Sequence, residues 1–300
     1  MKNNTLSKDH RVYVNLLSDV GFKIVFGNPQ NKSILIGLLN LVLPPEAHVQ
    51  DIETYLDRER TPTFLEGKKT LLDLICRDDR GQTFEVEIQR DVESSFFKRC
   101  VFYASDLYHS QMEAGNNFDI LKPVYLISFL ERKWPHRDES EWDTNRLISR
   151  YRFMEERTKD LTEPTIIITF AELGRFSKTL EECVSEQDYL FYWFLNGWRY
   201  ETVPEQYRHT SFKEELTRAT ELAGFSKDEL IVYNNALMND MDYRNALHQA
   251  KAQGLAEGKA QGLDEGKTKG IIEAARKMIN AGVDIKLVAK TLGVDVSQLK

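Results

Sequence analysis

Cysteine is scarce in this chain: three occur among its 300 residues, at positions 76, 100 and 183. No two of them form a CxxC pair, so the sequence argues against a disulfide framework and against a structural zinc site. The six histidines are scattered and show neither an HxH nor an HExxH spacing. The chain therefore has none of the usual sequence patterns of a zinc protein.

Long apolar runs are also missing. The longest extends from Ile34 to Leu43 and is interrupted by Gly37 and Asn40, whereas a membrane-spanning helix needs about 18 consecutive apolar residues. The first ten residues, MKNNTLSKDH, contain no apolar region of the kind found in signal peptides. We therefore predict no membrane partner and a reducing, cytoplasmic location.

An excess of positive charge is absent as well. The formal net charge is -7 and the isoelectric point is about 5.5, so the overall electrostatic field does not favour nucleic acid. Any DNA binding must depend on a local basic surface or on bridging cations. With 41% hydrophobic residues, the chain has an ordinary globular composition and enough length for one large domain or two smaller ones.

The most informative stretch is TLLDLICRDDRGQTFEVEIQ, from Thr70 to Gln89. Apolar and polar residues alternate on both sides of a polar connection that ends in Gly81, which is typical of two strands joined as a β-hairpin. The second strand has an apolar face suited to a core, formed by Phe84, Val86 and Ile88. Its opposite face carries two carboxylates and an amide, on Glu85, Glu87 and Gln89.

Acidic residues on this hairpin form a candidate metal site. Side chains two positions apart on a strand lie about 7 Å apart on one face, and Asp73 interrupts the apolar run of the first strand. Two carboxylates plus water can hold Mg²⁺, which neutralises charge on a phosphate and lowers the pKa of bound water. The alternative interpretation is a solvated hairpin face without a ligand.

The rest of the pattern predicts an α/β core with a small mixed sheet. We expect helices over 18–27, 32–43 and 94–114, strands over 52–56, 123–130 and 165–170, a loop over 131–146 and helices within 186–240. The aromatic segment DYLFYWFLNGWRY, residues 188–200, is compatible with base stacking. Core packing is favoured instead, because its apolar residues fit the inner face of a helix: Leu190, Trp193, Phe194 and Leu195.

Glycine recurs every four residues in the C-terminal tail, at Gly254, Gly258, Gly262, Gly266 and Gly270. Five interior glycines cost an isolated helix about 4–5 kcal/mol relative to alanine, so we expect either a flexible arm or a stripe that another helix approaches closely. We favour the stripe, although such small-residue packing is best known from membranes. It predicts a homo-oligomer, a dimer formed through this segment.

The end of the chain is similar to the opening of a helix-turn-helix. We expect a helix over 271–281, a second over 285–292 capped by Asp284, and a third that begins at Asp295. Only five residues remain after Asp295, too few for a normal recognition helix. Residues 251–300 carry nine Lys/Arg and six Asp/Glu, a net charge of +3 (9 − 6), which is compatible with nucleic-acid contact or with a solvated helical arm.

Several motifs together resemble the Rpn proteins, recombination-promoting nucleases and transposases of the PD-(D/E)XK superfamily. SDVGFKIVFG and NKSILIGLLNLVL resemble the first two helices of that family, and LLDLICRDDRGQTFEVEIQ resembles its active-site strands. FFKRCVFYASDLYHSQMEAG resembles the next helix, with Arg99, Tyr103 and Gln111 at matching places. The resemblance covers most of 18–130 and the glycine tail. It implies a restriction-endonuclease-like core over 1–180, followed by a helical extension over 181–250 and the tail over 251–300.

By this resemblance the protein is a Mg²⁺-dependent DNA endonuclease that acts in recombination or transposition, with defence against foreign DNA as a further role. Asp73 and Glu87 would hold the ion with the backbone carbonyl of Ile88, and Gln89 would orient the attacking water.

The first helix adds two further candidates. Asp19 would be an additional acid, and Lys23, one turn later, would supply positive charge near the phosphate. The alternatives are an N-cap for Asp19 and a solvated side chain for Lys23.

Two positions depart from the superfamily pattern. Leu72 stands where the proline would be, and Gln89 replaces the lysine, in keeping with the Rpn branch. Glutamine neither acts as a base nor carries charge, so the reaction would depend more on the ion. This leaves two other hypotheses open: a catalytically inactive nuclease fold that binds DNA or associates with an active relative, and an interaction scaffold built on the tail.

Overall fold

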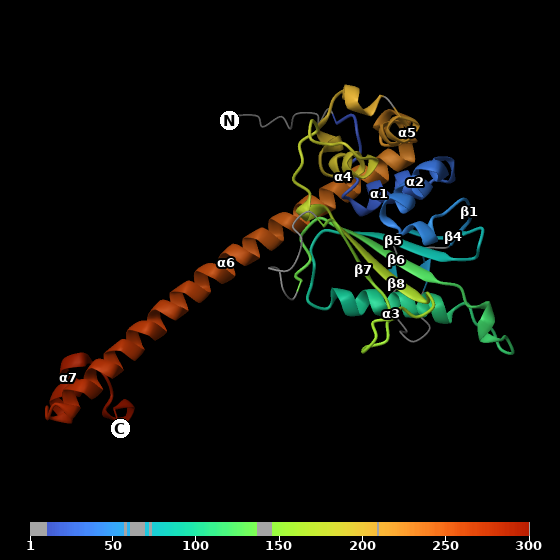
Figure 1. Ribbon diagram of the computed structural model, residues 1–300. Helices are drawn as coiled ribbons and strands as arrows, with labels where there is room; N and C mark the ends of the chain where they lie inside the picture. Colours follow the sequence, from blue (N-terminus) through green and yellow to red (C-terminus); the bar gives the residue numbers. More distant parts are fainter. Residues whose placement is uncertain are drawn as a thin grey trace, which may run out of the picture. The chain divides into compact units, whose positions relative to one another are not determined.

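The computed structural model describes residues 11–56, 59–60, 70–71, 74–136, 146–208 and 210–299. The chain divides into two compact units, Met1–Ala236 and Leu237–Lys300. The first unit contains the sheet and the helices around it, and the second contains most of one long helix and the C-terminal turn (Figure 1).

A six-stranded mixed sheet forms the centre of the first unit, in the order β1-β4-β5-β6-β8-β7. The strands are β1 (Ile52–Tyr55), β4 (Leu74–Asp78), β5 (Thr83–Gln89), β6 (Val124–Leu130), β7 (Ile148–Tyr151) and β8 (Ile166–Glu172). β5, β6 and β8 are parallel, while β1–β4, β4–β5 and β7–β8 are antiparallel pairs. Two short strands, β2 (Glu59–Arg60) and β3 (Thr70–Leu71), pair separately.

Helices cover both faces of this sheet (Figure 1). One face carries α1 (Asp19–Phe26), α2 (Lys32–Val42) and α4 (Glu186–Asn196), with α5 (Ser211–Ala219) packed against α2 and α4. The other face carries α3 (Phe96–His109). Short 3₁₀ turns occur at Pro29–Asn31, Pro45–Ala47, Phe118–Ile120, Leu173–Arg175, Gly197–Arg199, Glu205–Tyr207, Leu222–Gly224 and Val296–Gln298. This arrangement confirms the predicted α/β class and its PD-(D/E)XK type of architecture.

The aromatic segment of α4 belongs to the core. Leu190, Trp193 and Phe194 are buried, and the Phe194 ring stacks on Phe129 of β6 with centroids 5.0 Å apart. The Trp193 indole donates a hydrogen bond of 3.0 Å to the hydroxyl of Thr220. Leu195 is only half-buried. Core packing is therefore confirmed for this segment, and the burial leaves no exposed stacking surface on these three side chains.

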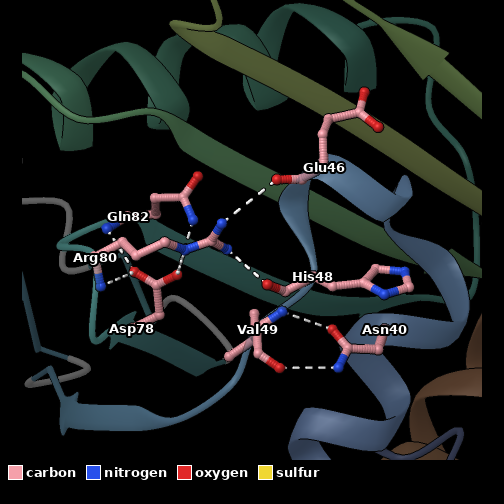
Figure 2. Close-up of polar contacts among 7 residues, drawn as sticks. All are labelled: Asn40, Glu46, His48, Val49, Asp78, Arg80 and Gln82. Atoms are coloured by element: carbon pink, nitrogen blue, oxygen red, sulfur yellow. Dashed lines mark hydrogen bonds and ion pairs between the residues drawn. The ribbon is translucent and has the colours of Figure 1, made fainter.

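A buried carboxylate fixes the turn of the β4–β5 hairpin (Figure 2). Asp78 is fully buried and accepts hydrogen bonds from the backbone N–H groups of Arg80 and Gln82 and from both of their side chains, at 2.8–3.2 Å. Arg80 in turn donates to the backbone oxygen of His48 at 2.6 Å. A charge of this kind is tolerated inside a protein only with such partners, so the turn is tied to the segment that precedes β1.

Two local predictions differ from the structure. The helix expected over 94–114 is shorter, Phe96–His109, because a turn follows it at once. Strand β7 was not expected, since its four residues, ISRY, show little alternation and gain their pairing from β8. The expected strands over 123–130 and 165–170 correspond to β6 and β8.

The glycine repeat lies within one continuous helix, α6 (Lys227–Asn280). A Cβ atom added at any of its five glycines would meet nothing within 4 Å, so the repeat forms an open row on the helix surface. No helix among the described ranges is long and apolar enough to cross a membrane.

The end of the second unit agrees with the prediction at α7 (Ile285–Leu292) but differs on either side of it: the helix expected over 271–281 is the last part of the continuous α6, and a 3₁₀ turn, Val296–Gln298, follows Asp295. Asp284 caps α7 by accepting hydrogen bonds from the N–H groups of Lys286 and Leu287, and Gly293 ends the helix with φ 67°. Positive φ favours glycine there. A small core holds α7 to the end of α6, formed by Ala275, Val288, Ala289 and Leu299.

Candidate active site

Glu87 lies on β5 with its side chain half-buried against α3. Its Oε1 atom accepts a hydrogen bond of 2.7 Å from the hydroxyl of Ser128, the residue beside it on β6. The thiol of Cys100 on α3 points at the same oxygen, at 3.9 Å. Two neighbouring elements therefore orient the carboxylate of a residue that is half-buried.

Glu85 lies two residues before Glu87 on the same face of β5 and is fully buried. Its strand partners are Ile75 on β4 and Leu126 on β6. A buried carboxylate is costly unless it is paired or protonated. The face of β5 that turns toward α3 thus carries two successive carboxylates, as the alternation predicts.

Gln89 ends β5 and contacts α3 through its amide. Its Oε1 accepts a hydrogen bond of 2.6 Å from Arg99, and its Nε2 donates to the backbone oxygen of Asp91. The Arg99 guanidinium also lies over the ring of Phe96, 5.0 Å from the centroid. The uncharged Gln89 therefore holds a cation at the end of the strand, next to the position where the superfamily has its lysine.

The Cys100 thiol stays protonated in this environment. Burial raises its pKa, and the charge of Glu87 raises it further. A protonated thiol is a poor metal ligand. The remaining donors beside it are carboxylate and hydroxyl oxygens, a set that suits a hard cation such as Mg²⁺ better than zinc.

The other predicted metal ligands are placed only in part. Ile88 lies on β5 beside Phe129 of β6. Asp73 falls outside the described residues, and the described β4–β5 pairing ends with Leu74 opposite Val86. Within the described ranges, no group of three or more His, Cys, Asp or Glu side chains is arranged to hold a metal ion.

Asp19 and Lys23 lie on α1, at its first residue and one turn later. Ser18 is the N-cap, with its hydroxyl accepting from the N–H of Gly21 at 3.1 Å, so Asp19 is not the cap. Asp19 is exposed and Lys23 is half-buried. Helix α1 packs Phe22 against Phe129, 6.5 Å between ring centroids, on the sheet face opposite to Ser128 and Glu87.

Two residues of this site were not assigned a role from the sequence. Arg99 is brought to Gln89 by the packing of α3 on the sheet, and Ser128 is brought to Glu87 by the parallel pairing of β5 and β6. Ser128 left one signal, because it is the only polar residue besides a tyrosine inside the apolar strand VYLISFL. For Arg99 the signal was its place in the family-like helix motif.

A mixed sheet between helices, with an acidic hairpin strand at its centre, is consistent with a PD-(D/E)XK type of nuclease fold. A family model described as PD-(D/E)XK nuclease family transposase matches residues 16–250. The chain belongs to this family, as the Rpn resemblance implied. It therefore has a function of the nuclease or transposase type. Nucleases of this kind generally use divalent metal ions as cofactors. The curated proteins and the solved structures contain no match to it.

Proposed function

We propose that the protein is a Mg²⁺-dependent DNA endonuclease that hydrolyses phosphodiester bonds at the α3 side of β5. The observation that carries this proposal is the pair Glu87 and Gln89, which lie on one face of β5 with ordered partners, Ser128 and Arg99. The family description, a transposase, supports a role in recombination or transposition. The cytoplasmic location and a role in defence stay predictions from the sequence.

Asp73 is proposed as the second carboxylate ligand. It directly precedes Leu74 in the sequence, and consecutive Cα atoms are about 3.8 Å apart. Leu74 pairs with Val86, the neighbour of Glu87, and paired Cα atoms lie about 5 Å apart. The chain neighbours of Asp73 and Glu87 are therefore strand partners, and this supports the proposal that the two carboxylates share one ion.

Asp73, Glu87 and the backbone carbonyl of Ile88 would hold the ion. A bound Mg²⁺ supplies charge neutralisation at a phosphate and a lower pKa for bound water. Glu87 is kept in place for this role by Ser128. Gln89 is proposed to orient the attacking water, and Arg99 supplies the positive charge that the superfamily lysine would bring. Asp19 and Lys23 stay proposals from the sequence, and the packing of α1 on the sheet face opposite to Glu87 gives them no support.

The second candidate is an inactive nuclease fold that binds DNA or associates with an active relative. The observation that favours it is the amide of Gln89, which is already bonded to Arg99 and to the backbone of Asp91 and carries no basic group. Self-association through the glycine row of α6 is compatible with both candidates, and we propose it as the dimer contact.

Cleavage of supercoiled plasmid tests the first candidate. We expect nicking or linearisation with Mg²⁺, none with EDTA, and none for Asp73→Ala or Glu87→Gln. Glu113→Gln is the matched control, because it removes an exposed carboxylate just beyond α3. The thermal unfolding of each variant shows whether it folds.

Three outcomes decide between the candidates. Metal-dependent cleavage that is lost in Asp73→Ala and Glu87→Gln but kept in Glu113→Gln supports the nuclease. Cleavage that survives both substitutions comes from a contaminant or from another site and contradicts the proposal. No cleavage in Mg²⁺, Mn²⁺ or Co²⁺, together with intact DNA binding, leaves the inactive nuclease fold.

A further inference from the structure

A cleft of about 510 Å³ lies between the edge strand β7, the segment after β8 and the first turn of α4. Four cationic side chains line it, on Arg146, Arg150, Arg175 and Lys178. Its volume is typical of ligand sites. A cleft with this lining stands out in a chain whose net charge is -7, and it is the kind of local basic surface that DNA binding by an acidic protein requires.

Two carboxylates offset part of this charge. Asp188 pairs with Lys178 at 2.7 Å, and the buried Glu172 pairs with Arg175 at 2.6 Å. The four cations and these two carboxylates leave a net charge of +2 (4 − 2). These ion pairs also hold the side chains of Arg175 and Lys178 in fixed positions on the wall of the cleft.

Arg150 is grouped with other cations. Its described hydrogen bond goes to a neutral acceptor, the backbone oxygen of Val42, at 2.6 Å. Burial lowers the pKa of Arg150, and the charges of Arg152 and Arg146 lower it further, while Glu46 raises it. Arg146 and Arg150 both line the cleft, so an anion bound between them would be attracted by both guanidinium groups.

The cleft opens at the end of the sheet that carries the candidate active site. Gln89, Leu130 and Glu172 lie side by side across β5, β6 and β8, and the N–H of Glu172 donates to the backbone oxygen of Leu147 at 2.8 Å. Two strand spacings separate Glu172 from Gln89, about 10 Å. The residues that line the cleft lie on β7 and directly after β8, next to Glu172.

We propose that this basic cleft binds the phosphodiester backbone of duplex DNA a few phosphates away from the bond that is cut. The inference rests on the proposed function of the β5 site. A duplex lying across the carboxyl ends of β5, β6 and β8 would pass Gln89, at the end of the strand that carries Glu87, and then the cleft beyond β8. The grouped arginines suit phosphate oxygens, which they bind through planar forks of N–H donors.

Equilibrium binding of a 30-base-pair duplex in EDTA, followed by fluorescence anisotropy on the full chain, tests the proposal. Removing one cation that neutralises a phosphate reduces the slope of log K against log salt by about 1. We therefore expect Arg146→Gln/Arg150→Gln to reduce the slope by about 2 and to weaken binding roughly tenfold at 100 mM salt. The control Arg208→Gln/Lys227→Gln removes two exposed cations elsewhere in the first unit and leaves the slope unchanged.

Two further comparisons keep the proposal open to refutation. Arg150→Lys keeps the charge but loses the planar fork and changes the bond to Val42, so it should keep the wild-type salt slope and bind more tightly than Arg150→Gln. A decrease in affinity equal to that of Arg150→Gln would assign the effect to folding and overturn the proposal.

Inorganic phosphate and a deoxynucleoside monophosphate, each at the same phosphate concentration as the duplex, should compete poorly with the duplex for binding. Equal competition would make the cleft a small-anion site instead.

The binding assay tests the phosphate cleft and the cleavage assay tests the catalytic site, so either proposal can be refuted without the other. If Glu87→Gln abolishes cleavage while the cleft variants keep the wild-type salt slope, the nuclease stands and the phosphate cleft is wrong. If the wild type cuts nothing but the cleft variants bind more weakly as expected, the cleft stands and the catalytic assignment is wrong.

Discussion

Arg99 donates a hydrogen bond of 2.6 Å to the side-chain oxygen of Gln89, so a helix and a strand end share one charged contact. The amide cannot carry charge itself, but it holds a guanidinium beside the end of β5. In the proposed nuclease, this guanidinium would supply the positive charge that the superfamily lysine brings. This contact also gives the first test of the site.

Replacing Arg99 should slow cleavage with little effect on folding. We expect Arg99→Gln to reduce kcat roughly 100-fold, because removing one donor to a developing negative charge costs about that much, with a smaller change in KM. Lys98→Gln removes an equal charge from the exposed neighbouring position of α3 and is the control. If the two variants cut DNA at the same rate, Arg99 has no role in the reaction.

Ser128 is expected to tune metal affinity through Glu87. Its hydroxyl orients the carboxylate at 2.7 Å, and removing such an outer partner typically costs 10- to 100-fold in metal affinity. We expect Ser128→Ala to raise the Mg²⁺ concentration for half-maximal cleavage by about 10- to 100-fold. Ser149→Ala, which removes another buried hydroxyl of the same sheet, should leave that concentration unchanged, and an equal change in both variants would contradict the assignment.

The three thiols are expected to be unreactive in the folded protein. All are buried, and burial raises the pKa of Cys76 to about 12 and that of Cys183 to about 11. The pKa of Cys100 is raised for the same reason. The thiolate is the nucleophile, so labelling with a thiol reagent at pH 8 should be slow without denaturant and give three equivalents with it. Fast labelling of any one thiol in the native protein would contradict this environment.

The capping carboxylate of α4 should make stability depend on acid. Burial would raise the pKa of Asp188, but hydrogen bonds from Lys178 and from the backbone N–H groups of Ser185 and Val184 outweigh it and lower the pKa. A lowered pKa gives stability that is present above the unfolded value, about 3.9, and is lost as pH falls through the folded value. Asp188→Asn should cost about 2 kcal/mol near pH 7.

The measurement for Asp188 is chemical denaturation at pH 7 and pH 3. The free energy of unfolding should fall less between these pH values in Asp188→Asn than in the wild type. Glu186→Gln, an exposed substitution in the first turn of the same helix, is the control. A parallel fall in the variant and the wild type would show that Asp188 is not the group that titrates.

Much of the fold was predictable because its signals are local. The alternation in β5 predicted which side chains share a face, and the caps and glycines predicted α7 and its ends. Strand β7 was missed because its four residues show little alternation and it forms by pairing with β8. For the site, Glu87 and Gln89 followed from the two-residue period. Ser128 and Arg99 did not, because the parallel pairing of β6 and the packing of α3 bring them there.

The glycine row of α6 gives a test that separates helix stability from association. An added methyl group meets nothing within 4 Å. The triple variant Gly258→Ala/Gly262→Ala/Gly266→Ala should therefore make helix formation in α6 more favourable by about 0.8–1 kcal/mol for each site. The same change should weaken dimerisation, measured by sedimentation, if glycines are where two copies meet. Thr268→Ala, about 200° around the helix from Gly266, is the control. A dimer of unchanged strength would contradict a contact through this row.

The period of four has a consequence for how two such helices meet. An α-helix turns 400° in four residues, so each glycine is rotated about 40° from the one before it, and the row winds round α6 by about 160° between Gly254 and Gly270. Rows of this kind pack against each other at a steep crossing of about −50°. Two helices that meet along this row therefore cross at one short contact and diverge on both sides of it. They do not run side by side as the helices of a coiled coil do.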